Sequence, residues 1–277
     1  TKVRYSLLPM KTHPLLACLV LSVASLAGAS ENTLRVAVVQ SVNDVALEAN
    51  RAKMVRFIRE AGEAGCHLAV FNENGLLENT EASVRKFPAK AEIDRAIEAI
   101  RAQTRSSRVA VIFGTAYVNA DGDPVRNRAY VFGPDGRLIQ AYWKNVEVPR
   151  PFDINGVRCA VTICSDRGYL EHSDLACVTH GAQVIIDISG GHGGDDGRPN
   201  LRWIRYQPWA ARNGAYVIVS NPVHDEKDFM GNSPYGGGSA VVRPDGSLQA
   251  SRSYEKEVMN VADLDLAAAT RSGAERR

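Results

Sequence analysis

The sequence predicts a single α/β domain in which helices cover mixed β-sheets. Short runs of β-branched and other apolar residues alternate with longer segments whose apolar residues recur at helical spacing. Two further stretches place Pro-Asp-Gly between strand-like runs, which indicates β-hairpins because proline presets the turn and glycine tolerates a positive φ. No run rich in proline or serine divides the 277 residues, so we expect one large domain.

The expected elements follow from these patterns in chain order. Residues 34–40 read LRVAVVQ, a near-continuous apolar run that is typical of a strand buried on both faces. Apolar residues at helical spacing predict a helix over 44–65, with Asn43 or Asp44 as its N-cap. Further strands are expected at 67–73, 108–118, 157–164, 183–189, 216–223 and 258–264, further helices at 89–105, 169–180 and 199–213, and hairpins at 129–144 and 239–251.

The composition and charge of the chain exclude several classes of protein. Hydrophobic residues make up 45% and charged residues 23%, which is ordinary for a globular protein. The formal net charge is only +2 and the basic residues are scattered, so we expect no nucleic-acid partner. The sequence lacks G-x-S-x-G, G-x-x-x-x-G-K and G-x-G-x-x-G, which disfavours serine hydrolases, P-loop ATPases and dinucleotide-dependent dehydrogenases. Its histidines lack metal-ligand spacing, so we expect no metal site.

The N-terminal segment has the layout of a secretory signal peptide. A basic residue precedes an apolar core at 15–26, and small residues at 27–29 resemble a cleavage site. The core has about a dozen residues, fewer than the roughly 20 that span a bilayer. We therefore expect residues 1–30 to direct export to the periplasm or the medium, with no stable membrane insertion after processing. Residues 34–266 are then the folded domain and residues 267–277 a polar tail.

Four cysteines would remain after processing. Cys159 and Cys164 lie five positions apart on one expected strand, so they point to opposite faces and cannot pair with each other. Whether Cys66 pairs with Cys177 stays open.

Three expected strands end on a side chain that can do chemistry. Glu73 follows LAVFN, Lys144 ends the return strand of the first hairpin, and Cys164 follows AVTI. Because functional groups gather at the carboxyl ends of strands in α/β folds, we expect the three to converge. A carboxylate can take the thiol proton, and an ammonium can stabilise charge on a substrate carbonyl oxygen. Taken singly, each residue has a plainer interpretation: a solvated carboxylate, a surface lysine and a cysteine that only packs.

Taken in order, these residues resemble the nitrilase superfamily of carbon–nitrogen hydrolases over positions 34 to 266. Single triplets of the pattern are weak signals, whereas the ordered set at strand ends is specific. The matching segments are AVVQ at 37–40, Phe71 to Glu73, Asn127, the GPDG hairpin at 133–136, Tyr142 to Lys144, Ile163 to Asp166, Gly181-Ala182, and Arg212-Asn213 through Tyr216 to Asn221.

The resemblance implies a four-layer α-β-β-α sandwich with two mixed β-sheets, a homodimer or larger assembly, and a Glu-Lys-Cys triad without metal or cofactor. Matched motif to motif, Glu73 takes the role of general base, Lys144 that of oxyanion stabiliser and Cys164 that of nucleophile. Only 20 positions separate Lys144 from Cys164, so the loop that carries the family's second, substrate-positioning glutamate is shortened. Glu147 is the only glutamate in that interval and is the candidate to replace it in substrate binding.

Ser165 and Asp166 follow Cys164, which is closer to the Cys-aromatic-Asp of the family's amidases than to the Cys-Trp-Glu of its nitrilases. The expected function is therefore hydrolysis of a non-peptide C–N bond of a small amide, to an acid plus ammonia or amine, through a thioester on the cysteine. Nitrile hydrolysis or N-acyl transfer on the same triad stays open, as does a catalytically silent binding protein with the same fold.

Overall fold

The computed structural model of the chain divides it into two units, residues 1–30 and residues 31–277. The structure describes residues 33–78, 87–120, 123–147, 150–168, 180–191, 203–223, 236–251 and 256–269, all of which belong to the second unit. The expected signal peptide, Cys177, nearly all of the helix at 169–180 and most of the polar tail lie outside these residues and stay predictions. Within the described ranges, no helix is long and apolar enough to cross a membrane.

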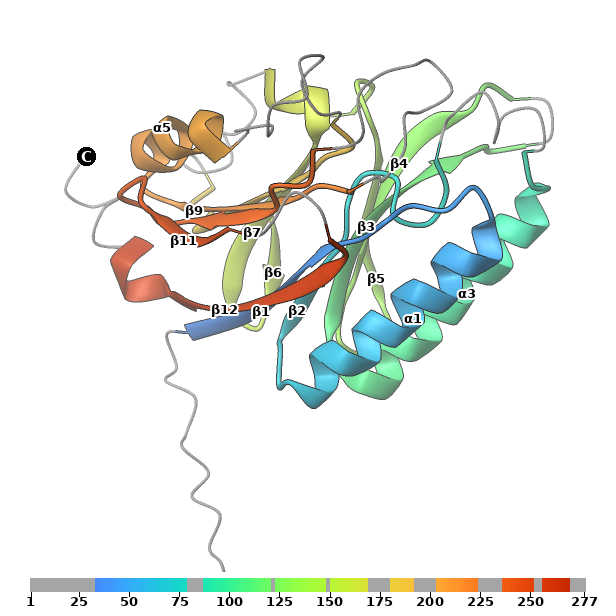
Figure 1. Ribbon diagram of the computed structural model, residues 1–277, viewed down its shortest axis with the longest axis horizontal. Helices are drawn as coiled ribbons and strands as arrows, with labels where there is room; N and C mark the ends of the chain where they lie inside the picture. Colours follow the sequence, from blue (N-terminus) through green and yellow to red (C-terminus); the bar gives the residue numbers. More distant parts are fainter. Residues whose placement is uncertain are drawn as a thin grey trace, which may run out of the picture. The chain divides into compact units, whose positions relative to one another are not determined.

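Two six-stranded sheets form the centre of the second unit (Figure 1). The first sheet contains β12 (Val258–Asp265), β1 (Thr33–Gln40), β2 (Leu68–Val70), β3 (Ala110–Tyr117), β4 (Arg126–Phe132) and β5 (Leu138–Trp143), in that order. The second contains β11 (Leu248–Ser251), β10 (Ala240–Val242), β9 (Tyr216–Ser220), β8 (Val184–Ile188), β7 (Val157–Ile163) and β6 (Phe152–Ile154). Both sheets are mixed, because β1–β2–β3 and β7–β8–β9 pair in parallel and the outer strands pair antiparallel.

Helices cover the outer faces of the sheets, which completes the four layers. Helices α1 (Leu47–Glu63) and α3 (Lys90–Ser107) lie side by side against the first sheet, and α5 (Trp203–Asn213) lies against the second (Figure 1). Strand β1 shows why the sequence folds this way: Val36 and Val38 face the core between the sheets, while Ala37 and Val39 face the helices. A strand buried on both faces needs the continuous apolar run that the sequence contains.

Both hairpins form at the predicted Pro-Asp-Gly turns. β4 pairs antiparallel with β5, and β10 pairs antiparallel with β11. Gly136 and Gly246 take φ values of 78° and 86°, which residues with a side chain rarely adopt. The turn chemistry therefore sets the register of each return strand.

Several expected boundaries were wrong: the strand expected at 216–223 ends at Ser220, the helix expected at 89–105 continues to Ser107, and three others lie near the candidate site. Helix α1 begins at Leu47 with Ala46 as N-cap and no side-chain capping bond, because Asn43 Oδ1 accepts the amide of Asn72 and Asp44 Oδ1 accepts the N–H of Ala46. The strand expected at 67–73 ends at Val70, where the chain leaves the sheet for a turn. Cys164 is not the last residue of β7 but the first of a 3-10 helix, η1 (Cys164–Gly168).

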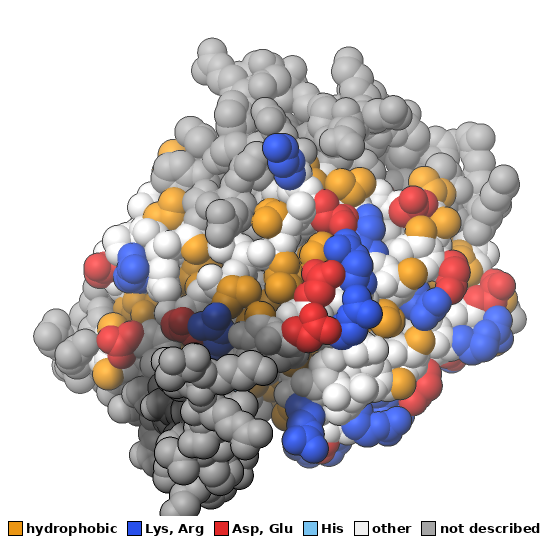
Figure 2. Space-filling view, turned by 60° about the horizontal axis from the view of Figure 1, so that its bottom comes forward, with side chains coloured by type: hydrophobic (Ala, Val, Ile, Leu, Met, Phe, Trp, Pro, Cys, Tyr) orange, Lys and Arg blue, Asp and Glu red, His pale blue; other side chains and the backbone are white. Residues whose placement is uncertain are grey.

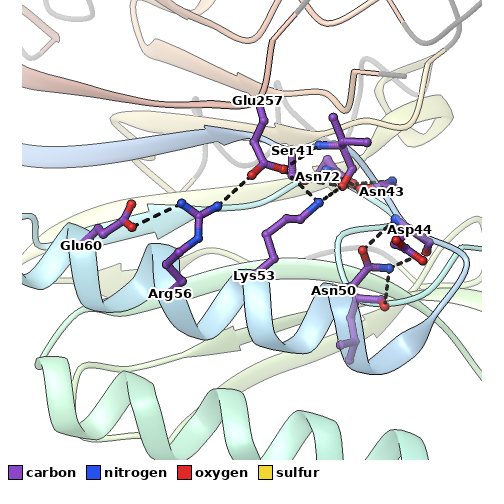
Figure 3. A network of polar contacts seen from close by, with 11 residues as sticks. Ser41, Asn43, Asp44, Asn50, Lys53, Arg56, Glu60, Asn72 and Glu257 are labelled. Carbon is purple, nitrogen blue, oxygen red and sulfur yellow. Dashed lines mark hydrogen bonds and ion pairs between the residues drawn. The ribbon is translucent and has the colours of Figure 1, made fainter. Parts of the chain in front are cut away.

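Glu257, just before β12, ties α1 to the loop that follows β1 (Figure 3). Its carboxylate lies 2.8 Å from the Arg56 guanidinium and 2.9 Å from the Lys53 ammonium. It also accepts the backbone N–H of Val42 at 3.1 Å. The Lys53 ammonium in turn donates to the carbonyl of Val42. The loop is therefore held by a partly buried charge network and not by a single surface pair.

Elsewhere on the helices the ion pairs are exposed, and in Figure 2 acidic and basic side chains lie next to one another on the described part of that face. The pair between Arg59 and Glu63 is an example, at 3.7 Å with side chains 61% and 68% exposed. Exposed pairs of this kind contribute little to stability because water and salt screen them.

Glu257→Gln is expected to lower the free energy of unfolding by about 1–2 kcal/mol, since it weakens two charge-assisted contacts at once. The matched control Glu63→Gln is expected to cost less than about 0.5 kcal/mol. Urea unfolding at low and high salt checks both values. Equal losses in the two variants would contradict the assignment of the network.

Candidate active site

Glu73 lies in a turn that packs against both sheets. The chain leaves β2 at Val70, and the N–H of Gly114 on β3 donates to the carbonyl of Asn72 at 3.1 Å. The N–H of Glu73 itself donates to the carbonyl of Ser189, beyond β8 of the second sheet, at 3.3 Å. Glu73 is 3% exposed. The turn therefore holds a buried carboxylate at the junction of the two sheets.

The residue before Glu73 anchors the turn through its side chain (Figure 3). The Asn72 amide donates to Ser41 Oγ at 2.8 Å and to Asn43 Oδ1 at 3.2 Å. Its own Oδ1 accepts the N–H of Asn74 at 3.0 Å. Because Ser41 and Asn43 belong to the loop that Glu257 holds, the Glu257 network extends to the neighbour of Glu73.

Two donors from the β4–β5 hairpin meet the Glu73 carboxylate. Lys144 Nζ lies 2.5 Å and Asn127 Nδ2 lies 2.6 Å from the same oxygen, Oε1. The N–H of Lys144 also donates to the carbonyl of Asn127 at 3.0 Å, so the hairpin register places both donors together. On the other oxygen, Oε2, the backbone of Gly190 comes so close that an added Cβ would lie 2.9 Å away.

The electrostatics of the site keep Lys144 charged. Burial, the largest single cause, would lower the pKa of Lys144, but the charge and hydrogen bond of Glu73 oppose it. The charges of Cys164 and Asp166 add smaller contributions in the same direction, and the pKa of Lys144 ends above its ordinary value. The ammonium is therefore available across the physiological pH range.

Cys164 reaches the same site from the second sheet. It is partly buried, and its backbone has φ = 49°, a left-handed conformation that is unusual for a residue with a side chain. Its N–H donates to Asp187 Oδ1 at 3.0 Å. Of the predicted residues, the structure joins Glu73 to Lys144 by a direct contact, and the charge of Cys164 is a minor cause of the raised pKa of Lys144.

A bridge of polar contacts links the turn after Lys144 to the turn of Cys164. The N–H of Asn145 donates to Asp166 Oδ1 at 3.0 Å, and Ser165 Oγ donates to Asn145 Oδ1 at 3.4 Å. Asp166 is 3% exposed, and burial raises the pKa of its carboxyl although the N–H groups of Asn145 and Ile163 oppose this. The two strand ends are therefore fastened to each other.

Glu147, the candidate for substrate binding, is exposed. Its carboxylate accepts the N–H of Trp143 at 3.0 Å and closes the turn that carries Lys144. Its part in substrate binding stays a prediction.

Sequence reasoning assigned no role to Asn127, Asp166 or Asp187. The hairpin register could have indicated Asn127, because it lies opposite Lys144 across the β4–β5 ladder. Asp187 lies opposite Thr162 on β7, a pairing that becomes visible only with the strand register. In the described part of the chain, no group of three or more His, Cys, Asp or Glu side chains is arranged to hold a metal ion.

Gly114→Ala is expected to displace the Glu73 turn, because the new Cβ would lie 2.1 Å from the carbonyl oxygen of Glu73. Overpacking of this kind costs about 1–3 kcal/mol of unfolding free energy. Gly75→Ala, in the same turn, is the control: its Cβ would lie 3.3 Å from its nearest neighbours, so a smaller loss is expected. Urea denaturation measures both variants, and an equal cost would refute the close approach at Gly114.

Comparison with known proteins identifies the family. The sequence pattern of the carbon–nitrogen hydrolases matches residues 35–272. The chain is 23% identical to the omega-amidase NIT2 of Homo sapiens over 78% of its own length and 83% of that protein. It is 24% identical to the glutamine-dependent NAD(+) synthetase of Aquifex aeolicus over 83% of its own length, but spans only 42% of the synthetase.

Solved structures show the same fold. A carbon–nitrogen hydrolase from Helicobacter pylori matches with a TM-score of 0.76 at 18% identity, over 89% of this chain and 94% of that one. An amidase from Nesterenkonia sp. matches with a TM-score of 0.73 at 18% identity, over 90% and 96%. These matches confirm the α-β-β-α sandwich that the motifs indicated. The chain belongs to the carbon–nitrogen hydrolase family.

Proposed function

We propose that the protein hydrolyses a small amide through a thioester on Cys164, with Glu73 as general base and Lys144 as oxyanion stabiliser. The observation that carries the proposal is the contact of 2.5 Å between the Lys144 ammonium and the buried Glu73 carboxylate. It is supported by the hydrogen bond from the N–H of Asn145, next to Lys144, to Asp166, in the turn that begins with Cys164.

The geometry supports a separate role for each of the three side chains in the first half of the reaction. Glu73 takes the thiol proton, and the Cys164 sulfur attacks the amide carbon to form a C–S bond and a tetrahedral oxyanion. Lys144 stabilises that oxyanion, a contribution of about 3–4 kcal/mol where one such donor has been removed from other enzymes. The proton passes from Glu73 to the departing nitrogen, the C–N bond breaks, and ammonia or amine leaves.

The second half of the reaction restores the enzyme. Glu73 removes a proton from a water molecule, whose oxygen attacks the thioester carbon. The C–S bond then breaks, the proton returns to the sulfur and the acid is released. No group beyond the three side chains and water is needed to balance these steps.

The names of similar proteins support an amide as the substrate class. One relative is called an omega-amidase. For the Nesterenkonia amidase, a structure of a variant carries the acetamide moiety of fluoroacetamide on its active-site cysteine, and another holds butyramide. Glu147 as a substrate contact, export through residues 1–30 and assembly into a homodimer or larger oligomer are further parts of the proposal.

Cys164→Ala is expected to abolish ammonia release from short aliphatic amides, because the nucleophile is lost. Glu73→Gln and Lys144→Met are expected to lower kcat by at least about 100-fold. The measurement is ammonia release over a panel of amides and nitriles, with mass spectrometry of wild-type protein after fluoroacetamide. Free acid as the product distinguishes hydrolysis from acyl transfer.

The matched control is Cys159→Ala, on the strand that leads to Cys164. Cys159 is 0% exposed within the core between the sheets, and burial raises the pKa of its thiol to about 12, so the native thiol is inert. This variant should keep both activity and the fluoroacetamide adduct. Activity in Cys164→Ala that equals wild type would remove Cys164 from the mechanism.

A further inference from the structure

Asp187, on β8, carries a carboxyl group inside an apolar layer. It is 0% exposed, and Ile185 on the same strand faces the outer core beneath α5 together with Tyr206. Burying a carboxyl group is costly unless hydrogen-bond donors meet it. The hydrogen-bond donors that contact its two oxygens therefore indicate the role of Asp187.

Three donors from different elements converge on this carboxyl group. Oδ1 accepts the N–H of Cys164 at 3.0 Å and the hydroxyl of Thr162 at 3.2 Å. Oδ2 accepts the hydroxyl of Tyr206 from α5. The parallel register places Thr162 directly opposite Asp187, so one contact is set by the ladder itself. The other two contacts connect the turn of Cys164 to α5 through Asp187.

Cys164, whose N–H donates to Asp187, has an unfavourable backbone conformation. A φ of 49° crowds the Cβ of any residue other than glycine, and such conformations persist only where the surroundings hold them. In this conformation the chain turns from β7 into η1, where Ser165 and Asp166 form hydrogen bonds with Asn145, the residue after Lys144. Without the acceptor on its N–H, Cys164 would relax toward an ordinary backbone and its thiol would move.

We propose that Asp187 is a positioning residue of the active site: by accepting the N–H of Cys164, it holds the left-handed turn that aims the thiol at the Glu73–Lys144 pair. The inference rests on the proposed function, because it takes Cys164 as the nucleophile. It also has a consequence for the mechanism. The N–H of Cys164 is occupied, so it does not donate to the substrate oxygen, and Lys144 carries that role.

The variants Asp187→Asn and Asp187→Ala separate the contact from the charge. Both remove the carboxylate, but asparagine keeps an oxygen for the N–H of Cys164 and can turn its amide toward Tyr206, whose hydroxyl can accept. We expect Asp187→Asn to retain kcat within about threefold. Asp187→Ala should lie about 100-fold below Asp187→Asn in kcat with little change in KM, since a displaced nucleophile impairs the chemical step.

Tyr206→Phe is the control for stability. It leaves Oδ2 of Asp187 without the tyrosine hydroxyl but keeps the contact to Cys164, so the urea midpoint should fall while kcat stays within about threefold. If activity merely followed stability, Tyr206→Phe and Asp187→Ala would lose kcat in proportion to their midpoints. That result would overturn the positioning role.

A second readout does not depend on knowing the substrate. Iodoacetamide alkylation of Cys164, followed by mass spectrometry with Cys164→Ala as the blank, should be about tenfold slower in Asp187→Ala than in Asp187→Asn. Equal alkylation rates and equal kcat in these two variants refute the inference while leaving the proposed function intact. Full ammonia release by Cys164→Ala refutes the proposed function instead, and with it the role of Asp187.

Discussion

The buried contact between Glu73 and Lys144 is the interaction on which the site depends. A carboxylate that is 3% exposed needs a partner, because an unpaired charge in that position would be strongly destabilising. The partner comes from a hairpin whose register is set by a Pro-Asp-Gly turn, and Asn127 from the same hairpin supplies a second donor. Close packing then excludes side chains at Gly114 and Gly190, where an added Cβ would meet the backbone or carboxylate of Glu73.

The third group reaches the site only because the two sheets pack face to face. Glu73 and Lys144 follow strands of the first sheet and Cys164 follows a strand of the second, so the apolar layer between the sheets sets their separation. Several hydrogen bonds cross this boundary, among them Glu73 N–H to the Ser189 carbonyl and the Ser220 hydroxyl to the Val39 carbonyl. The geometry of the site therefore depends on core packing, since any shift of one sheet against the other moves the Cys164 thiol relative to the Lys144 ammonium.

Sequence patterns predicted mixed sheets covered by helices, the hairpins and the meeting of Glu73 with Lys144, because these follow from periodicity, turn chemistry and the position of strand ends. The four-layer sandwich was implied by the family resemblance. They did not predict that Cys164 begins a 3-10 helix with a positive φ, since the conformation of one residue is decided by its tertiary contacts. The positioning role proposed for Asp187 could not be predicted from the sequence for a related reason. The partners of an aspartate within an apolar strand become known only when the strand register places it opposite Thr162 and the fold brings Tyr206 next to it.

Glu73 and Asp187 are two of the buried carboxyl groups near Cys164, and they differ in their hydrogen bonds. Among the described residues, both donors to Glu73 use Oε1, while Oε2 lies beside the backbone of a glycine. Glu73 can therefore bind a proton on Oε2 without breaking a contact. Asp187 instead accepts two neutral donors on Oδ1 and one on Oδ2. These contacts support the proposed proton transfer by Glu73, which pairs with a cation, and the proposed positioning role of Asp187, whose donors named above are neutral.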